Sequence, residues 1–98
     1  MATSKDELNQ ILEKLAPIGD FTVRPMMGEY LLYYNGVLVG GVYDNRLLIK
    51  KSDSNQNCNL PEEIPYDTAK RTMYHATDFN NLKQLKTIIA NTYHDLKK

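Results

Sequence analysis

The stretch RPMMGEYLLYYNG, residues 24–36, decides the fold of this chain. In this stretch an apolar run ends at the dipeptide Asn35-Gly36, and a second apolar run begins directly after it. Asn-Gly between two apolar runs is the strongest short signal for a β-hairpin, because both central residues of a type I′ turn need positive φ. The stretch therefore predicts antiparallel strands over residues 29–34 and 37–43, joined by a tight turn.

Two further strands extend this hairpin. Asp44-Asn45 is a weaker turn signal of the same kind, and it introduces a strand over residues 46–51. On the other side, FTVR at residues 21–24 alternates apolar and polar residues, as a half-buried strand does. Pro25 cannot donate to a sheet ladder, so it ends that strand or lies at an edge or a bulge.

Within the predicted strand over residues 37–43, Gly40 and Gly41 have no side chains to pack. Adjacent glycines inside a strand indicate a bulge or a close neighbour. Beyond the four strands, residues 52–65 are polar with two prolines and predict a loop. A possible fifth strand runs from Thr72 to Ala76.

Helices are predicted at both ends of the chain. Ser4 and Glu7 have the spacing of a capping box, and leucines and an isoleucine follow at helical spacing up to Leu15. This predicts an amphipathic helix over residues 5–16. Near the other end, Asp78 is expected to cap a long final helix whose apolar residues keep the same period.

The order helix, four strands, loop, strand, helix predicts an α+β fold in one domain, residues 1–98. An antiparallel sheet of about five strands would be covered on one face by the N- and C-terminal helices. The chain carries no net charge and 42% hydrophobic residues, as an ordinary globular protein does. We find no apolar run long enough for a membrane helix and no secretory signal, and the single cysteine, Cys58, excludes an internal disulfide. We therefore expect a cytoplasmic protein.

Three blocks in order, RPMMGEYLLYYNG, DNRLLIKK and PYDTAKRTMYHATD, resemble the N-terminal domain of the TfoX/Sxy family over about residues 5–96. The matching positions are Arg24, Met26, Gly28, Tyr30, Gly36, Asp44, Arg46, Leu47, Lys50, Pro65, Tyr66, Ala69 and Lys70. Met27, Glu29 and Leu31 depart from the family pattern, which has an aromatic residue and glycines there. The longer members carry a second, C-terminal domain, and the resemblance does not include it.

The resemblance implies a secretion-chaperone-like α+β sandwich, and it implies a homodimer. It also implies a protein partner in transcription regulation, since the family is named after regulators of natural competence. Those regulators are two-domain proteins, and the resemblance covers their N-terminal domain.

Candidate partner- or ligand-binding residues gather around the opening stretch. They are Arg24, Met27, Gly28, Tyr30, Tyr34, Arg46 and Lys50. The tyrosines would offer contact area with a polar tip if their side of the sheet is free, and otherwise they form a half-buried sheet face. The cations would form a patch for an anion or an acidic partner, or they are gatekeeping charges at a sheet edge.

Other chemistry is not indicated by the sequence. Cys58, His75 and His94 lack metal-ligand spacing, so no metal is expected. No catalytic residue and no cofactor motif can be assigned, because the chain has neither a nucleophile elbow nor a phosphate-binding loop. Direct DNA binding is disfavoured, since Lys70, Arg71 and the lysines after them would form only a thin basic area.

Two functions follow as hypotheses. The first is a non-enzymatic regulatory module that acts through protein contacts. The alternative is a small-molecule or anion-binding domain, or an enzyme, that uses a cationic patch near the turn at residues 26–28.

Overall fold

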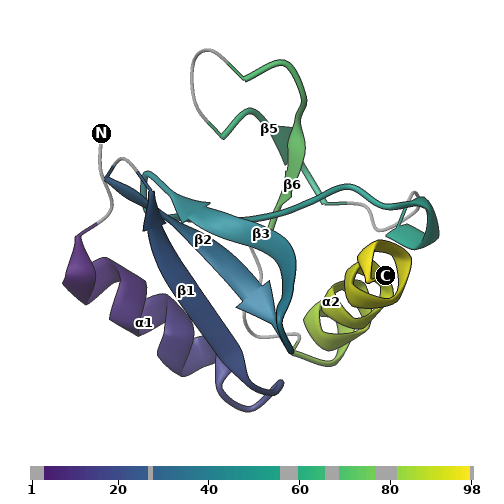
Figure 1. Ribbon diagram of the computed structural model, residues 1–98, viewed down its shortest axis with the longest axis horizontal. Coiled ribbons are helices and arrows are strands. Elements are labelled where there is room, and N and C mark those ends of the chain that lie inside the picture. Colours follow the sequence, from purple (N-terminus) through teal and green to yellow (C-terminus); the bar gives the residue numbers. More distant parts are fainter. Residues whose placement is uncertain (1–3, 27, 56–59, 66–68, 77–81, 98) are drawn as a thin grey trace.

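The computed structural model describes residues 4–26, 28–55, 60–65, 69–76 and 82–97. Their elements, in chain order, are α1 (Lys5–Leu15), β1 (Phe21–Met26), β2 (Glu29–Tyr34), β3 (Val37–Tyr43), β4 (Arg46–Ile49), the short 3-10 helix η1 (Asp53–Asn55), β5 (Glu62–Glu63), β6 (Met73–His75) and α2 (Leu82–Leu96). Figure 1 shows α1 and α2 on opposite sides of the molecule, with the strands β1 to β3 between them. The α+β class is confirmed.

The strands form one antiparallel sheet in the order β1-β2-β3-β4-β6-β5. The four-strand meander predicted from the two turns is therefore confirmed. Both turns have the expected backbone: φ is 50° at Asn35 and 84° at Gly36, and it is 51° and 59° at Asp44 and Asn45. The sheet has six strands among the described residues, against about five expected.

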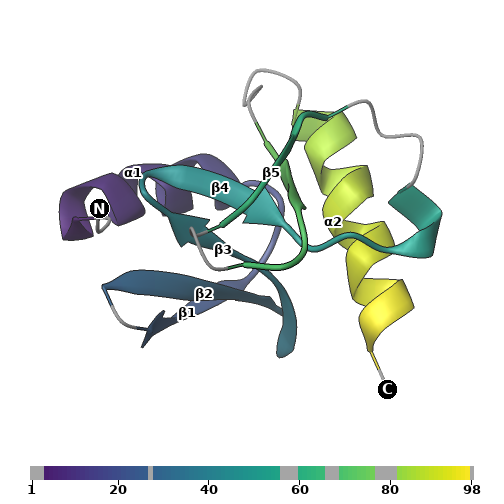
Figure 2. The same cartoon turned by 90° about the horizontal axis from the view of Figure 1, so that it is seen from above.

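The additional strand is β5, which lies inside the segment predicted as a loop. Its two glutamates have no apolar alternation, so the local sequence gives no strand signal. They pair because β6 offers a free edge, with Glu62 opposite Tyr74 and Glu63 opposite Met73. Figure 2 shows β5 and its flanking segments apart from β1 and β2.

Some predicted boundaries also change. β1 continues through Pro25 to Met26, which is possible because β1 lies at the edge of the sheet. β4 ends at Ile49, two residues earlier than expected. The predicted cap Asp78 lies outside the described residues, as does Cys58.

Helix α1 begins as the sequence predicts. The Ser4 hydroxyl accepts a hydrogen bond from the Glu7 amide at 3.2 Å, and the Glu7 carboxylate accepts one from the Ser4 amide at 2.9 Å. This reciprocal pair satisfies two amides that a helix start leaves without partners. Leu8, Ile11 and Leu15 face the sheet and are buried.

One apolar core fills the space between the two helices and one face of the sheet. It joins side chains of α1 and α2 to Leu32, Val42 and Ile49 of the sheet, among others. The register places Tyr30 and Tyr34 on this same face, because residues two apart along a strand point the same way. Leu47 and Ile49 also face this core, as predicted.

The opposite face carries neither helix, and we call it the helix-free face. Leu31, Tyr33, Leu38, Tyr43 and Leu48 are on it by register. Tyr43 and Leu48 lie outside the core cluster but are only 5% and 0% exposed. Residues 60–65 and 69–72, which we call the strap, border this face next to them.

The two glycines in β3 mark a close approach between strands. The pairing of β2 with β3 shifts between Leu32 and Tyr33, as a β-bulge does. A Cβ on Gly40 would lie 2.1 Å from the Leu48 carbonyl oxygen. A side chain at position 40 would therefore separate β3 from β4, which confirms that the glycines mark both a bulge and a close neighbour.

Candidate functional site

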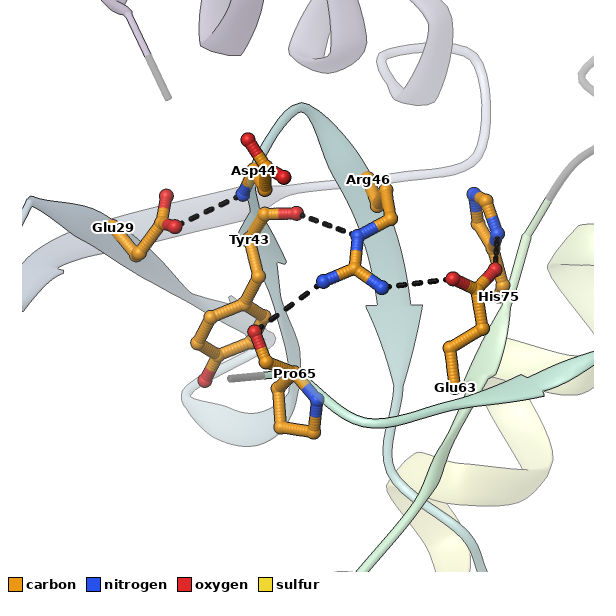
Figure 3. Close-up of polar contacts among 7 residues, drawn as sticks. All are labelled: Glu29, Tyr43, Asp44, Arg46, Glu63, Pro65 and His75. Atoms are coloured by element: carbon orange, nitrogen blue, oxygen red, sulfur yellow. Dashed lines mark hydrogen bonds and ion pairs between the residues drawn. The ribbon is translucent and has the colours of Figure 1, made fainter. Parts of the chain in front are cut away.

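Arg46, at the start of β4, is held by three groups on different segments. Its Nη1 forms an ion pair with Glu63 Oε1 at 2.8 Å. Its Nε donates to the Tyr43 carbonyl at 3.2 Å, and its Nη2 donates to the Pro65 carbonyl at 3.4 Å. Figure 3 shows the guanidinium spread between these acceptors. The planar guanidinium can serve several acceptors at once, and here it fixes the strap to the β3–β4 turn.

Glu63 completes this cluster by binding a second partner. Its other carboxylate oxygen, Oε2, contacts Nδ1 of His75 on β6 (Figure 3). The Arg46 guanidinium, followed by His75, holds the pKa of Glu63 below its usual value, because both partners favour the charged carboxylate. The carboxylate is therefore ionised at neutral pH and bound on both sides.

Two contacts extend the polar framework around the strap. Lys51 pairs with Glu62, and Thr72 Oγ1 donates to Glu62 Oε1 at 2.8 Å. At the turn between β3 and β4, the Asp44 amide donates to Glu29 Oε2 at 3.0 Å, so this turn is joined to the start of β2 (Figure 3). The strap is thus tied to β4 and β6 by charged groups.

An open cleft of about 1030 Å³ lies between the strap and the helix-free face. Leu31, Leu38 and Met73 line it with apolar surface from three strands, and each is half-buried. Pro65, which is buried, and Ala69 line it from the strap. A large cleft with an apolar lining is the usual form of a binding site.

Four cations line the same cleft: Lys50, Lys51, Lys70 and Arg71. Lys51 is paired with Glu62. Lys50, Lys70 and Arg71 form no ion pair with any other residue that the structure describes. The cleft therefore combines an apolar lining with three positive charges that can meet an outside anion.

The structure separates the residues that the sequence predicted as one site. Lys50 lines the cleft, and Arg24 is exposed on the helix-free face with its guanidinium carbon 6.0 Å from the centre of the Tyr33 ring. Arg46 is on that face too, but its guanidinium is bound within the chain. Gly28 has φ of 88° in the turn before β2. Met27 lies outside the described residues.

Tyr30 and Tyr34 point to the core face. Tyr34 packs against Phe21 at 5.0 Å and against Tyr93 of α2 at 5.7 Å, measured between ring centroids. Both tyrosines are partly buried against the core cluster. Tyr30 and Tyr34 are therefore part of a half-buried sheet face. The tyrosine of β2 on the helix-free face is Tyr33.

Sequence reasoning missed Glu62, Glu63 and Lys51. The two glutamates belong to a polar stretch with no strand pattern. Nothing local therefore indicated that Glu63 would contact Arg46 and His75, or that Glu62 would pair with Lys51. For the cleft, the excess of six bases over two acids in residues 70–98 was the available signal. It predicted a local basic area but could not place Lys70 and Arg71 beside Lys50.

Within the described ranges, no three His, Cys, Asp or Glu side chains come together as a possible metal site. In the same part of the chain, no helix has both the length and the apolarity needed to cross a membrane. His75 is oriented by Glu63, as a catalytic base would be, but it makes no contact with a described serine, threonine or cysteine side chain.

The comparison with known families gives one match. The sequence model of the TfoX N-terminal domain matches residues 13–95, which is most of the chain. A comparison with curated proteins finds no match. The matched region contains the whole sheet, the helix α2 up to Asp95, and all the cleft residues named above. With the α+β fold and the antiparallel sheet already established, this chain belongs to the TfoX N-terminal domain family.

Proposed function

We propose that this chain is a non-enzymatic regulatory module that binds a protein partner through the helix-free face of its sheet. Membership of the family supports a regulatory module in a general sense. The observation that carries the proposal is the cleft: it is open, its lining is apolar, and three of its cations have no acidic partner among the described residues. Such a surface is suited to recognition.

The non-enzymatic part of the proposal rests on the arrangement of the reactive groups. His75 and Glu63 are bound to each other, and the Glu63 carboxylate is also bound by Arg46. Neither residue lines the large cleft. A general base has to lie within hydrogen-bond reach of the group it deprotonates, and this pair lies outside the large cleft. His75 instead lines a smaller pocket of about 360 Å³ beside α1.

Homodimer formation, location in the cytoplasm and a link to transcription or competence regulation are parts of the same proposal. Their support is the family membership alone. Native mass spectrometry of the purified chain is the direct measurement of the oligomeric state. A second copy is compatible with the cleft as long as it covers another part of the surface.

Site-specific photo-crosslinking tests the proposed binding face. A photoreactive phenylalanine analogue placed at Leu38 reports on the cleft, and the same analogue at Lys86, an exposed residue of α2, reports on the helix side. We expect a defined partner to be captured from position 38 and not from position 86, and to bind again when it is purified. Capture of the same proteins from both positions would show that the helix-free face is not the binding face.

A second candidate function is an anion-binding domain, which Lys50, Lys70 and Arg71 favour because none of them forms an ion pair with another described residue. We propose that its centre lies away from the turn at residues 26–28, since Arg46 is bound within the chain and Lys50 lines the cleft together with Lys70 and Arg71. Ligands that bind only the folded state raise its stability, so a thermal-shift screen with phosphorylated metabolites tests this function. No shift at millimolar ligand would exclude it.

A further inference from the structure

The lining of the cleft also indicates what kind of segment would occupy it, if the proposed function holds. We infer that the cleft binds an acidic segment of a partner protein that also carries an apolar side chain. The segment's carboxylates would meet Lys50, Lys70 and Arg71, and its apolar side chain would cover Leu31, Leu38 and Met73.

Charge complementarity defines the first half of this specificity. The three cations lie on both sides of the cleft, with Lys50 directly after β4 and the other two in the strap. Each lacks an acidic partner among the described residues, so an anion that binds does not have to break an ion pair within that part of the chain. Lys70 and Arg71 are exposed, which places them where an incoming segment meets them first.

The apolar lining defines the second half. A cleft of about 1030 Å³ is far larger than a single carboxylate or phosphate group. A simple anion at the rim would leave Leu31, Leu38 and Met73 in water, and so it would gain nothing from their surface. A segment with an apolar side chain gains from both kinds of contact, and its affinity is correspondingly higher.

The same lining argues against a nucleic acid as the occupant. Binding of single strands uses aromatic rings on which bases stack, together with a continuous basic groove. Among the described residues of the lining, the apolar side chains are aliphatic apart from Tyr43, which is only 5% exposed.

A labelled peptide tests this specificity with the purified chain. The probe is an alternating glutamate and leucine peptide of about eight residues, which spans roughly 26 Å when extended. One comparison peptide replaces each glutamate by lysine, and another replaces each leucine by serine. Inorganic phosphate and a single-stranded oligonucleotide complete the set, and binding is measured by fluorescence anisotropy and by competition.

We expect the glutamate–leucine peptide to bind, the lysine peptide to show no binding, and the serine peptide to bind at least about tenfold more weakly. Lys50→Glu and Arg71→Glu should each weaken binding by about tenfold. The matched control is Lys86→Glu, an exposed lysine on α2 outside the cleft, which should leave binding unchanged. Circular dichroism of each variant checks that the fold is retained.

Three results would overturn the inference. They are equal binding of the glutamate and lysine peptides, equal binding by the parent and Arg71→Glu, and tighter binding of the oligonucleotide than of the peptide. Failure here is distinguishable from failure of the proposed function. A partner captured from position 38 through a segment without acidic residues would overturn only this inference, whereas absence of capture from that position counts against the binding face itself.

Discussion

Arg46 of β4 and Glu63 of β5 form an ion pair of 2.8 Å although β6 lies between their strands in the sheet. The pair is possible because both side chains reach across β6, where His75 contacts the same carboxylate. Three strands are thereby joined by one acidic group. The consequence is that a strand of only two residues, β5, has a defined position next to the cleft.

The charge of Glu63 should contribute to stability in a pH-dependent way. We expect Glu63→Gln to lower the free energy of unfolding at neutral pH by about 0.5–1 kcal/mol, since the side chain is partly exposed and solvent screens the pair. Its pKa is lowered in the folded state, so the contribution is present above the usual carboxyl value of 4.5 and is lost as the pH falls through the lowered value. Urea unfolding of parent and variant from neutrality to about pH 3 measures this difference.

For Glu63→Gln the matched control is Glu13→Gln, which removes an exposed carboxylate from α1. We expect little change in stability for this control. If the difference between the parent and Glu63→Gln stayed constant over the whole pH range, the ionised carboxylate would not be the stabilising group.

Gly40→Ala should lower stability by about 1–3 kcal/mol, because the new methyl group has to displace backbone. The Cβ would lie 2.1 Å from the Leu48 carbonyl oxygen and 3.0 Å from the Ile49 Cα. The comparison variant is Gly19→Ala, where the nearest atom, at 2.9 Å, is in the Tyr34 ring and can move. Thermal unfolding should show the larger loss for Gly40→Ala, and equal losses would contradict the close approach of β3 and β4.

The turn before β2 requires a residue that tolerates positive φ. Gly28 has φ of 88°, so Gly28→Val should cost about 1–3 kcal/mol in free energy of unfolding. Asparagine enters this region more easily than other residues, and Gly28→Asn should therefore stay closer to the parent. A valine variant as stable as the asparagine variant would show that this backbone conformation is incidental.

A buried amide connects η1 to α2. The Asn55 side-chain nitrogen donates to Thr92 Oγ1 at 2.8 Å and to the Ile88 carbonyl at 3.0 Å, and Asn55 is only 2% exposed. We expect Asn55→Ala to cost about 1–3 kcal/mol, since buried groups lose their partner. Asn9→Ala, on the exposed side of α1, is the control, and denaturant unfolding should separate the two variants. Equal stability would mean that the amide is dispensable.

By itself, the sequence determined the elements whose signals are local. The positive φ that Asn35-Gly36 favours fixes the hairpin, and the Ser4–Glu7 capping box fixes the start of α1. Alternation along β4 correctly placed Leu47 and Ile49 in the core. These features depend on residues close together in the chain, so short patterns are sufficient to predict them.

Tertiary structure alone decided the character of the candidate site. The alternating pattern of β2 predicts two faces of side chains, but it does not indicate which face the helices cover. The packing of the helices places Tyr34 against the core and leaves Leu31 in the cleft. In the sequence, nothing distinguishes Arg46 from a free cation, but in the structure β5 places Glu63 next to it. Lys50, Lys70 and Arg71 belong to two distant segments, and they line the same cleft. The physical reason is that a side chain's availability depends on which distant groups reach it, and pairing over many residues of chain leaves no mark in the local sequence.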